Sequence, residues 1–525
     1  MRKYLSVIVM IAMTISLLCA CSSSSGADDD SKNGTQANQS ELVLTSTDWV
    51  EGIDFCQAEW WPDCASLTSD PLFIREADGT LSPGMATDYT VSEDGLTIRI
   101  TLASDLKYHD GTSVVPEDVK RSIEWASEKS MYSADFAVIE SIDVEGNDII
   151  LNLSSYSPSI LFYMGHNFWP TIKASDIDNK TPDDLRWTAT SYGPYYVDEY
   201  VSGSHVILKR NEYYKTYNTH VTNKGKEPVE TIRVRFTTDS FAIVQGMLAN
   251  EIDMSYDVTE SNIEELKANS SIECNWTPTT AVFRMLLNPQ DSIFADANVR
   301  KAFSLLIDRE KMAEYSDGAN KGAYALSISG MLDYSSEVED YFKKEYCNDT
   351  EKGLQLLKKS GWEDTNNDGI LDKDGNDFIV KIMYGDDAQK KIVELMQGLL
   401  KDDGIQVEGE MVDAGTYYES VTAGGNYQAA LAIFAWGDTS TSLPYLIPDQ
   451  SILDFDKFME GCEQASTIRD DATRVQAFAK LQKEVLDTNC VLPIVSVNAL
   501  FTCNSDKINH LYFDENGFIY LNDIE

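Results

Sequence analysis

Short segments in which apolar and polar residues alternate recur along the chain, as expected of strands that bury one face. Residues 42–47, LVLTST, predict a strand, and residues 96–102, LTIRITL, predict another whose partner we expect near residues 88–92. Residues 143–154, DVEGNDIILNLS, predict a hairpin, and residues 204–211 predict a further strand.

Two segments follow the periodicity of a helix instead. Residues 116–129, PEDVKRSIEWASEK, open with a proline and two acids, which favour a helix start, and then place Val119 and Ile123 one turn apart. Residues 296–315, DANVRKAFSLLIDREKMAEY, predict one amphipathic helix.

A strand, a helix and a second strand follow one another twice, which is typical of a mixed α/β fold. Residues 231–256 give the first such unit, and residues 376–413 give the second, with Gly404 where its helix stops. The sequence therefore indicates two α/β regions, roughly residues 190–283 and 290–480.

Two α/β lobes joined by crossing strands form a cleft, and ligands of such folds lie at the carboxyl ends of strands. Residues 429–436 predict a nearly all-apolar, buried strand that ends at Trp436, Gly437 and Asp438. These residues are therefore candidates for the region between the lobes.

The N-terminus carries the features of a targeting segment. Arg2 and Lys3 precede an apolar run at residues 5–18, which is too short to span a bilayer comfortably. The following LCAC, with Cys21, resembles a bacterial lipobox and leads into a Ser/Asp/Asn/Gly-rich stretch. By that resemblance residues 1–20 are a signal peptide, Cys21 carries a diacylglycerol and residues 21–40 are a flexible tether. The alternative is an ordinary secretory signal that contains a cysteine.

Charge narrows the classes of partner. The 525 residues include 86 Asp and Glu but 42 Lys and Arg, a formal net charge of −44. Such a chain repels nucleic acid and anionic headgroups, so we exclude nucleic-acid binding. An apolar content of 43% is ample for large cores and more than one lobe.

The cysteines give no metal or redox motif. Seven remain after Cys19 and Cys21 are assigned to the signal and the lipid, so at least one stays unpaired or pairs elsewhere. Cys56 with Cys64, and Cys490 with Cys503, are close enough in sequence to close small loops. No C-x-x-C occurs, which argues against a zinc cluster or a thioredoxin-like site.

His109 and Asp110 could belong to a catalytic dyad, to a metal site or to a turn. Asp110–Gly111 is a turn dipeptide, and Pro116 then begins a helix, so we expect these residues to shape a loop. The sequence has no H-E-x-x-H, G-x-S-x-G or G-x-x-x-x-G-K-[ST] motif. We therefore expect no enzyme activity, no cofactor and no metal.

Residues 364–375, DTNNDGILDKDG, begin like a calcium-binding loop. Asp364, Asp368 and Asp372 fall at ligand positions, but the twelfth position holds Gly375 where a bidentate glutamate is required. We interpret the segment as a solvated turn.

Five segments in order resemble the peptide/nickel-binding family, family 5, of extracellular solute-binding proteins of ABC importers. The resemblance runs from about Ser66 to the C-terminus. It rests on DGTLSPGMATDYTVSEDGLTIRITLASDLKYHDGTSVVPEDVKRS at 78–122, YGPYYVDEYVSGSHVILKRNEYY at 192–214, NVRKAFSLLIDREKM at 298–312, TEKGLQLLKKSGW at 350–362 and FAWGDT at 434–439.

The resemblance implies an α/β, two-lobed periplasmic-binding-protein-like fold (type II, cluster C), with an extra subdomain in the first lobe and a hinge between lobes. It divides the chain into the first-lobe core at 41–66, 190–283 and 491–525, the extra subdomain at 67–189, and the second lobe at 284–490.

The same resemblance suggests ligand-binding residues. In peptide-binding members a Trp-x-x-Asp aspartate pairs with the ligand's ammonium group, a role that falls here to Asp438, with Trp436 as a stacking wall. The spacing is one residue shorter here. The family's ligand-edge segment corresponds to residues 69–72, which include Asp70, and Pro71 removes one donor from that edge. No arginine could be assigned to a ligand carboxylate.

Three further side chains are candidates from position alone. Trp60 and Trp61 are adjacent, so both cannot face one core, and at least one is a candidate for the cleft; packing between the lobes is the alternative. Tyr384 lies at a strand-to-helix turn of the second lobe and could line the cleft.

We therefore expect a monomeric, lipid-anchored substrate-binding protein on the extracellular, or periplasmic, face of the cell membrane. It would capture short peptides between its lobes and deliver them to an ABC permease. An oligosaccharide, a metal chelate or another small solute is the alternative ligand, and a secreted hydrolase is the alternative class. A sensor that hands its ligand to a receptor is a further alternative.

Overall fold

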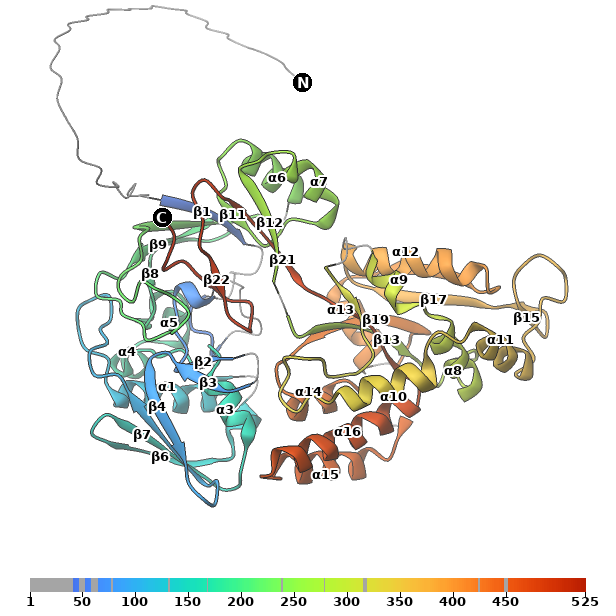
Figure 1. The fold of residues 1–525 in the computed structure, drawn as a ribbon, viewed down its shortest axis with the longest axis horizontal. Helices are drawn as coiled ribbons and strands as arrows, with labels where there is room; N and C mark the ends of the chain where they lie inside the picture. Colours follow the sequence, from blue (N-terminus) through green and yellow to red (C-terminus); the bar gives the residue numbers. More distant parts are fainter. Residues whose placement is uncertain are drawn as a thin grey trace, which may run out of the picture. The chain divides into compact units, whose positions relative to one another are not determined.

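The structure is a computed structural model (Figure 1). It describes residues 41–46, 52–57, 65–76, 79–130, 133–167, 169–237, 239–277, 279–314, 319–423, 425–447 and 452–525. All of them belong to one unit, residues 38–525, and everything below concerns that unit. The predicted signal peptide at residues 1–20 and tether at residues 21–40, with Cys21, lie outside the described residues, as do Trp60, Trp61 and Cys64.

Strands from distant parts of the chain form a seven-stranded sheet in the order β12-β21-β11-β1-β10-β9-β8. At its centre β1 (Glu41–Ser46) pairs in parallel with β10 (Thr231–Phe236) and β11 (Met254–Ser255). Helix α6 (Ser240–Leu248) connects β10 to β11, so the first predicted strand–helix–strand unit is confirmed. The other strands are β8 (Tyr195–Val201), β9 (His205–Arg210), β12 (Ile272–Thr277) and β21 (Ala499–Asn504).

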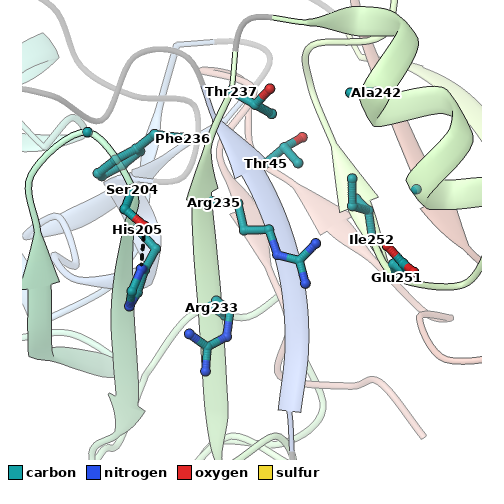
Figure 2. A pocket seen from close by; sticks show the side chains of 12 residues that line it. Thr45, Ser204, His205, Arg233, Arg235, Phe236, Thr237, Ala242, Glu251 and Ile252 are labelled. Atoms are coloured by element: carbon teal, nitrogen blue, oxygen red, sulfur yellow. Dashed lines mark hydrogen bonds between the residues drawn. The ribbon is translucent and has the colours of Figure 1, made fainter. Parts of the chain in front are cut away.

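Successive side chains of β10 lie on opposite faces of this sheet. Ile232 and Val234 are fully buried in the first-lobe core. Arg233 and Arg235 lie on the opposite face, where Figure 2 shows them beside α6. A small cluster under α6 and α7 (Ile263–Lys267) buries another part of that face, with Val43 of β1 packed against it.

A four-stranded antiparallel sheet, β4-β5-β7-β6, lies in the same lobe. As predicted, β4 (Ala86–Val91) pairs with β5 (Thr97–Leu102), and β6 (Ile139–Glu145) forms a hairpin with β7 (Asp148–Leu153). Helix α1 (Pro116–Lys129) has the predicted bounds. Its buried residues share one hydrophobic core with both sheets, which makes the sheets parts of one lobe.

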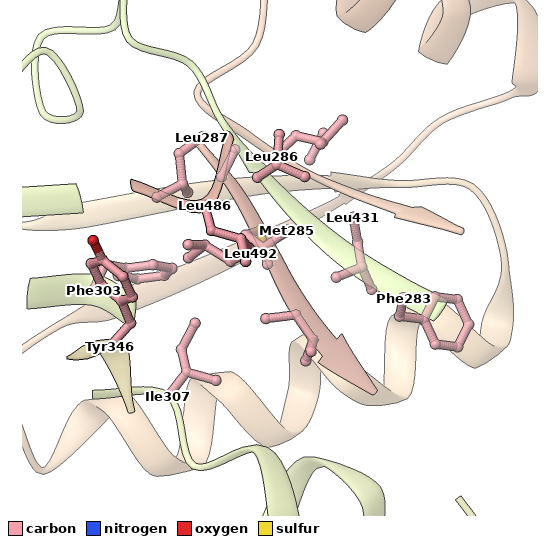
Figure 3. Packing of buried hydrophobic residues seen from close by; sticks show 14 of the residues in the cluster. Phe283, Met285, Leu286, Leu287, Phe303, Ile307, Tyr346, Leu431, Leu486 and Leu492 are labelled. Carbon is pink, nitrogen blue, oxygen red and sulfur yellow. The ribbon is translucent and has the colours of Figure 1, made fainter. Parts of the chain in front are cut away.

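The second lobe is built on a six-stranded sheet in the order β14-β20-β13-β19-β17-β18. Parallel strands β17 (Ile379–Tyr384) and β18 (Gln406–Met411), joined by α12 (Asp387–Lys401), confirm the second predicted unit. At the centre, β13 (Ala281–Leu287) is antiparallel to β19 (Ala429–Ala435) and β20 (Val491–Ser496), and β14 (Lys321–Gly322) forms the edge. Figure 3 shows the apolar side chains of these central strands packed together.

Two predicted lobe boundaries are wrong by a few residues. β13 begins at Ala281, before the expected boundary at 283/284, and β20 belongs to the second sheet although residues 491–525 were assigned to the first lobe. β20 is almost entirely buried, and its pairing with β13 brings together segments some 200 residues apart, which local sequence does not encode. The predicted disulfide Cys490–Cys503 is wrong. Cys490 precedes β20 in the second lobe, whereas Cys503 is a buried free thiol in β21 of the first lobe.

The single helix predicted at 296–315 is two helices, α8 (Ala297–Leu306) and α9 (Arg309–Ala313). Asp308 breaks it, since its side chain caps α9 by accepting from Lys311 N at 3.2 Å. Arg309 holds the break in place: its fully buried guanidinium donates to Pro493 O at 2.6 Å and to Ser304 O at 3.1 Å.

The chain passes between the two large sheets twice, from β12 to β13 and from β20 to β21. The two passages are hydrogen-bonded to each other: Val497 N donates to Ala281 O at 3.0 Å, and Thr279 Oγ1 donates to Val497 O at 2.5 Å. The same two segments also pair within each lobe: β12 pairs with β21 in the first-lobe sheet, and β13 pairs with β20 in the second-lobe sheet. The connection is thus a short two-stranded ribbon, the crossing ribbon.

The remaining described α-helices and strands lie outside the three sheets above, and none of the described helices has the length and apolar composition needed to cross a membrane. They are α2 (Ser133–Phe136), α3 (Pro158–Met164), α4 (Ala174–Asn179), α5 (Pro182–Thr188), α10 (Ser336–Tyr346), α11 (Thr350–Lys359), α13 (Ala414–Tyr418), α14 (Thr439–Tyr445), α15 (Phe455–Ser466), α16 (Asp471–Asp487), β2 (Phe73–Arg75), β3 (Leu81–Pro83), β15 (Asp372–Lys373), β16 (Asn376–Asp377), β22 (Tyr512–Phe513) and β23 (Ile519–Tyr520).

Candidate functional site

Asp438 lies at the junction of β19 and α14, and its carboxyl is completely buried. Oδ1 caps α14 by accepting from Ser440 N at 2.7 Å and from Ser440 Oγ at 2.8 Å. Oδ2 is buried without a hydrogen-bond partner among the described residues. Burial raises the pKa of the Asp438 carboxyl, against the opposing effects of the Ser159 and Ser440 hydroxyls and the charge of Arg474.

The first lobe meets this junction through α3. Ser159 Oγ lies 3.0 Å from Ser440 Oγ. Phe162 lies against Gly437, where an added Cβ would come 2.2 Å from Phe162 Cε2, so only glycine fits. Trp436 packs against the first-lobe core, and its Nε1 donates to Thr441 Oγ1 at 2.7 Å. Asp438 and Trp436 therefore lie where the two lobes touch.

Arg75 of β2 supplies a buried cation at the same contact, and sequence reasoning missed it. Its Nη1 donates to Gly330 O of the second lobe at 2.6 Å, and its guanidinium lies 5.3 Å from the centre of the Phe162 ring. Burial lowers the pKa of Arg75, opposed by the negative charges of Asp514, Glu515 and Asp438. The signal in the sequence is a cation three residues after the end of the expected ligand-edge segment, residues 69–72.

A buried ion pair supports Asp438 from within the second lobe. Arg474 Nε lies 3.0 Å from Asp333 Oδ1, and the two side chains are 3% and 1% exposed. Leu332 N donates to Gly437 O at 2.7 Å, which holds the Asp333 segment beside the Asp438 segment. Burial raises the pKa of Asp333 to about 6, with Arg474 opposing and Asp438 adding to the rise. Arg474 is thus engaged by Asp333 and is not the partner of Asp438 Oδ2.

The structure places Asp70 and Tyr384 in the interiors of different lobes. Asp70 is 3% exposed, its Oδ2 accepts from Tyr214 Oη at 2.8 Å, and burial raises its pKa to about 7. Tyr384 ends β17 and is 7% exposed within the second-lobe core. Their ligand-binding roles stay predictions, as do those of Trp60 and Trp61, which lie outside the described residues.

His109, Asp110 and Gly111 form a turn, as predicted. Gly111 has a positive φ of 81°, and Asp110 Oδ1 accepts from Thr112 N at 2.9 Å. Burial would raise the pKa of Asp110, but hydrogen bonds from Lys173 and Thr112 prevail and lower it to about 2. His109 stacks on Tyr196 with ring centroids 4.1 Å apart. Both side chains serve the loop and its packing.

The calcium-like segment is also a turn, closed by β15 and β16. Asp372 accepts from Thr365 N at 2.7 Å, and Asp364 accepts from Gly369 N at 3.1 Å. Across the part of the chain that the structure describes, no three His, Cys, Asp or Glu side chains are grouped so that they could hold a metal ion.

Two α/β lobes joined by crossing strands define the class of bilobal, periplasmic-binding-protein-like folds. The profile of the bacterial extracellular solute-binding proteins, family 5 (middle region), matches residues 80–450, more than half of the chain. The chain belongs to this family of ABC-importer solute-binding proteins, which are not enzymes.

Relatives and solved structures agree with this family. The oligopeptide-binding protein AppA of Bacillus subtilis is 23% identical over 451 residues, which cover 82% of this chain and 80% of AppA. NikA from Brucella suis, solved with Fe(III)-EDTA, has a TM-score of 0.79 at 20% identity, covering 92% of this chain and 99% of that chain. The structure of B. subtilis AppA with a nonapeptide has a TM-score of 0.66 at 17% identity, covering 92% of this chain and 99% of that chain. These likenesses confirm the predicted two-lobed fold.

Proposed function

We propose that this protein captures a short peptide between its lobes and delivers it to an ABC permease. The observation that carries the proposal is the Asp438 carboxyl, which is fully buried at the contact of the lobes with an oxygen that no described residue satisfies. A buried carboxylate oxygen without a hydrogen-bond partner, as Oδ2 is, is costly, and a ligand ammonium group would remove that cost. The oligopeptide-binding relative AppA supports peptide as the ligand class.

Arg75 fits the same ligand class, because a peptide carries a carboxylate as well as an ammonium group. The Arg75 Nε is buried without a hydrogen-bond partner among the described residues. Asp438 comes from the second lobe and Arg75 from the first, so a zwitterionic ligand would contact both. A ligand that contacts both lobes favours the closed state, since only that state offers both contacts.

The protein acts, in this proposal, as a monomer outside the membrane, tethered through a lipid on Cys21. The basic start, the apolar run and the LCAC sequence support the anchor. Incorporation of labelled palmitate into the full chain tests it: Cys21→Ala should abolish labelling, and labelling that persists would contradict the anchor.

A metal chelate is the second candidate ligand. Arg75 favours it, because its buried Nε is free of any hydrogen bond from the described residues and could bond an anionic complex. The structural neighbour NikA from Brucella suis holds Fe(III)-EDTA.

One pair of measurements separates the two ligand classes. Native mass spectrometry of the full chain purified from rich medium weighs any solute that co-purifies. Calorimetry then compares a peptide of that length with its N-acetylated form and with Fe(III)-EDTA. We expect the free peptide to bind and the acetylated form to bind at least tenfold more weakly. Equal binding of both peptides, or binding of the chelate alone, would overturn the peptide assignment.

A further inference from the structure

The seven-stranded sheet carries a cavity on its outer face, separate from the contact of the lobes. The hollow has a volume of about 660 Å³, and Ala242 and Gly246 of α6 line one side of it. The floor comes from Thr45 of β1 and from Arg233 and Arg235 of β10; the hairpin that leads into β9 contributes Ser204 and His205 (Figure 2).

Strand register explains why these side chains share one hollow. Arg235 is directly paired with Thr45 on one side and with His205 on the other, so the three form a row across β1, β10 and β9. Arg233 lies two residues earlier in β10 and therefore points to the same face. Figure 2 shows both guanidinium groups directed into the hollow.

Arg233 and Arg235 differ in whether an acidic side chain pairs with their guanidinium group. Arg233 Nε lies 2.8 Å from Glu41 Oε1, which neutralises it. The guanidinium of Arg235 makes no hydrogen bond or ion pair with any residue that the structure describes. Glu251 is the one acid among the lining residues, and it lies across the hollow on the α6 side.

We propose that this hollow is a second ligand site, which binds a small phosphate-type oxyanion through Arg235. The guanidinium fork suits two oxygens of such a group, and the hydroxyls of Ser204 and Thr237 and the ring of His205 border the same space. Ser204 Oγ lies 2.9 Å from His205 Nδ1, which fixes the ring and leaves Nε2 as its other hydrogen-bonding atom. The inference does not depend on the ligand that the two lobes capture.

Titration of the full chain with inorganic phosphate at constant ionic strength tests the site. We expect saturable binding, which Arg235→Gln weakens about tenfold or more, as the loss of a charge-assisted pair should. Lys209→Gln is the matched control: Lys209 lies on the same face of β9 and bonds Thr231 Oγ1 at 2.9 Å, outside the hollow. Its phosphate affinity should stay close to that of the unaltered chain.

A third variant gives an effect that misfolding cannot imitate. Glu251→Gln removes the opposing acid and should strengthen phosphate binding. The proposal is overturned if phosphate does not saturate, if Arg235→Gln and Lys209→Gln act equally, or if Glu251→Gln weakens binding.

Vesicles distinguish the two sources of a phosphate group. The Cys21→Ala chain, which lacks the proposed lipid anchor, is sedimented with phosphatidylglycerol or phosphatidylcholine vesicles, with and without Arg235→Gln. A preference for phosphatidylglycerol that Arg235→Gln removes would assign the group to a lipid. Equal sedimentation together with saturable phosphate binding would assign it to a dissolved solute.

Discussion

Phe162 and Gly437 join the two lobes by direct contact, with room for a hydrogen atom but not for a Cβ between them. Gly437→Ala should therefore push α3 away from the β19–α14 junction, at a cost of about 1–3 kcal/mol, the usual penalty of overpacking. We expect a larger radius of gyration by small-angle scattering and a weaker affinity for the ligand.

Phe162→Ala provides the control for that change, because it removes the ring that the new methyl group meets. The double variant should regain most of the compaction that Gly437→Ala loses. If Gly437→Ala scatters like the unaltered chain, the contact does not hold the lobes together.

Asp438→Asn should abolish the preference for a free peptide over its N-acetylated form. Asparagine still caps α14, so the helix start is kept while the negative charge is removed. Loss of a buried charge partner typically costs about 2–5 kcal/mol, so calorimetry with the free peptide should show that loss. Asp413→Asn, at the exposed cap of α13, should change nothing. Unchanged affinity in Asp438→Asn would rule out the ammonium role.

Arg474→Met should destabilise the second lobe, because it leaves the 1%-exposed Asp333 carboxylate without its cation. Breaking a buried pair from one side typically costs about 3–5 kcal/mol. Urea unfolding of the full chain measures this loss in the free energy of unfolding. The double variant Asp333→Asn with Arg474→Met should recover part of it, because the buried charge is removed together with its partner. A double variant that is less stable than Arg474→Met would contradict this account.

Asp70 should make the first lobe less stable as the pH rises. Burial raises its pKa from 3.8 to about 7, so between these values the folded chain holds a proton that the unfolded chain releases. The free energy of unfolding contributed by Asp70 is therefore highest at low pH and falls as the pH rises through that window. Asp70→Asn keeps an acceptor for Tyr214 but cannot ionise.

Urea unfolding at both ends of the window measures this effect. The unaltered chain should lose more stability than Asp70→Asn, by roughly 4 kcal/mol at most, since one pKa unit is about 1.4 kcal/mol. Asp88→Asn, on the exposed side of β4, should behave like the unaltered chain. Parallel pH profiles for the unaltered chain and Asp70→Asn would refute the assignment.

Local patterns predicted the elements well because their causes are local. Pro116 and the acids after it begin α1 at the predicted residue, and alternation places β5 and its partner β4 correctly. Both strand–helix–strand units follow for the same reason. The break between α8 and α9 has a local cap in Asp308, but Arg309 holds it through Pro493 O, a partner 184 residues away that the local pattern does not reveal.

The candidate site was only partly accessible from the sequence. Asp438 and Trp436 could be found because they follow a buried strand and resemble a family motif. Arg75 could not, since its position depends on contacts with Gly330 and Phe162 that only the folded chain creates. The bond between Asp70 and Tyr214 inside the first lobe could not be predicted either, and the ligand-binding role of Asp70 stays a prediction. Burial of this kind is decided by tertiary packing.

The crossing ribbon restricts how the lobes can swing. Because Val497 is bonded to both Ala281 and Thr279, neither strand of the ribbon can bend without carrying the other. The paired strands resist twisting of the crossing ribbon about its long axis, whereas bending of the ribbon out of its plane is easier. Rotation of one lobe against the other by bending is therefore favoured over rotation by twisting. The two lobes should therefore rotate about one common axis at the crossing ribbon. A solute would then meet the same two opposing surfaces each time the lobes close.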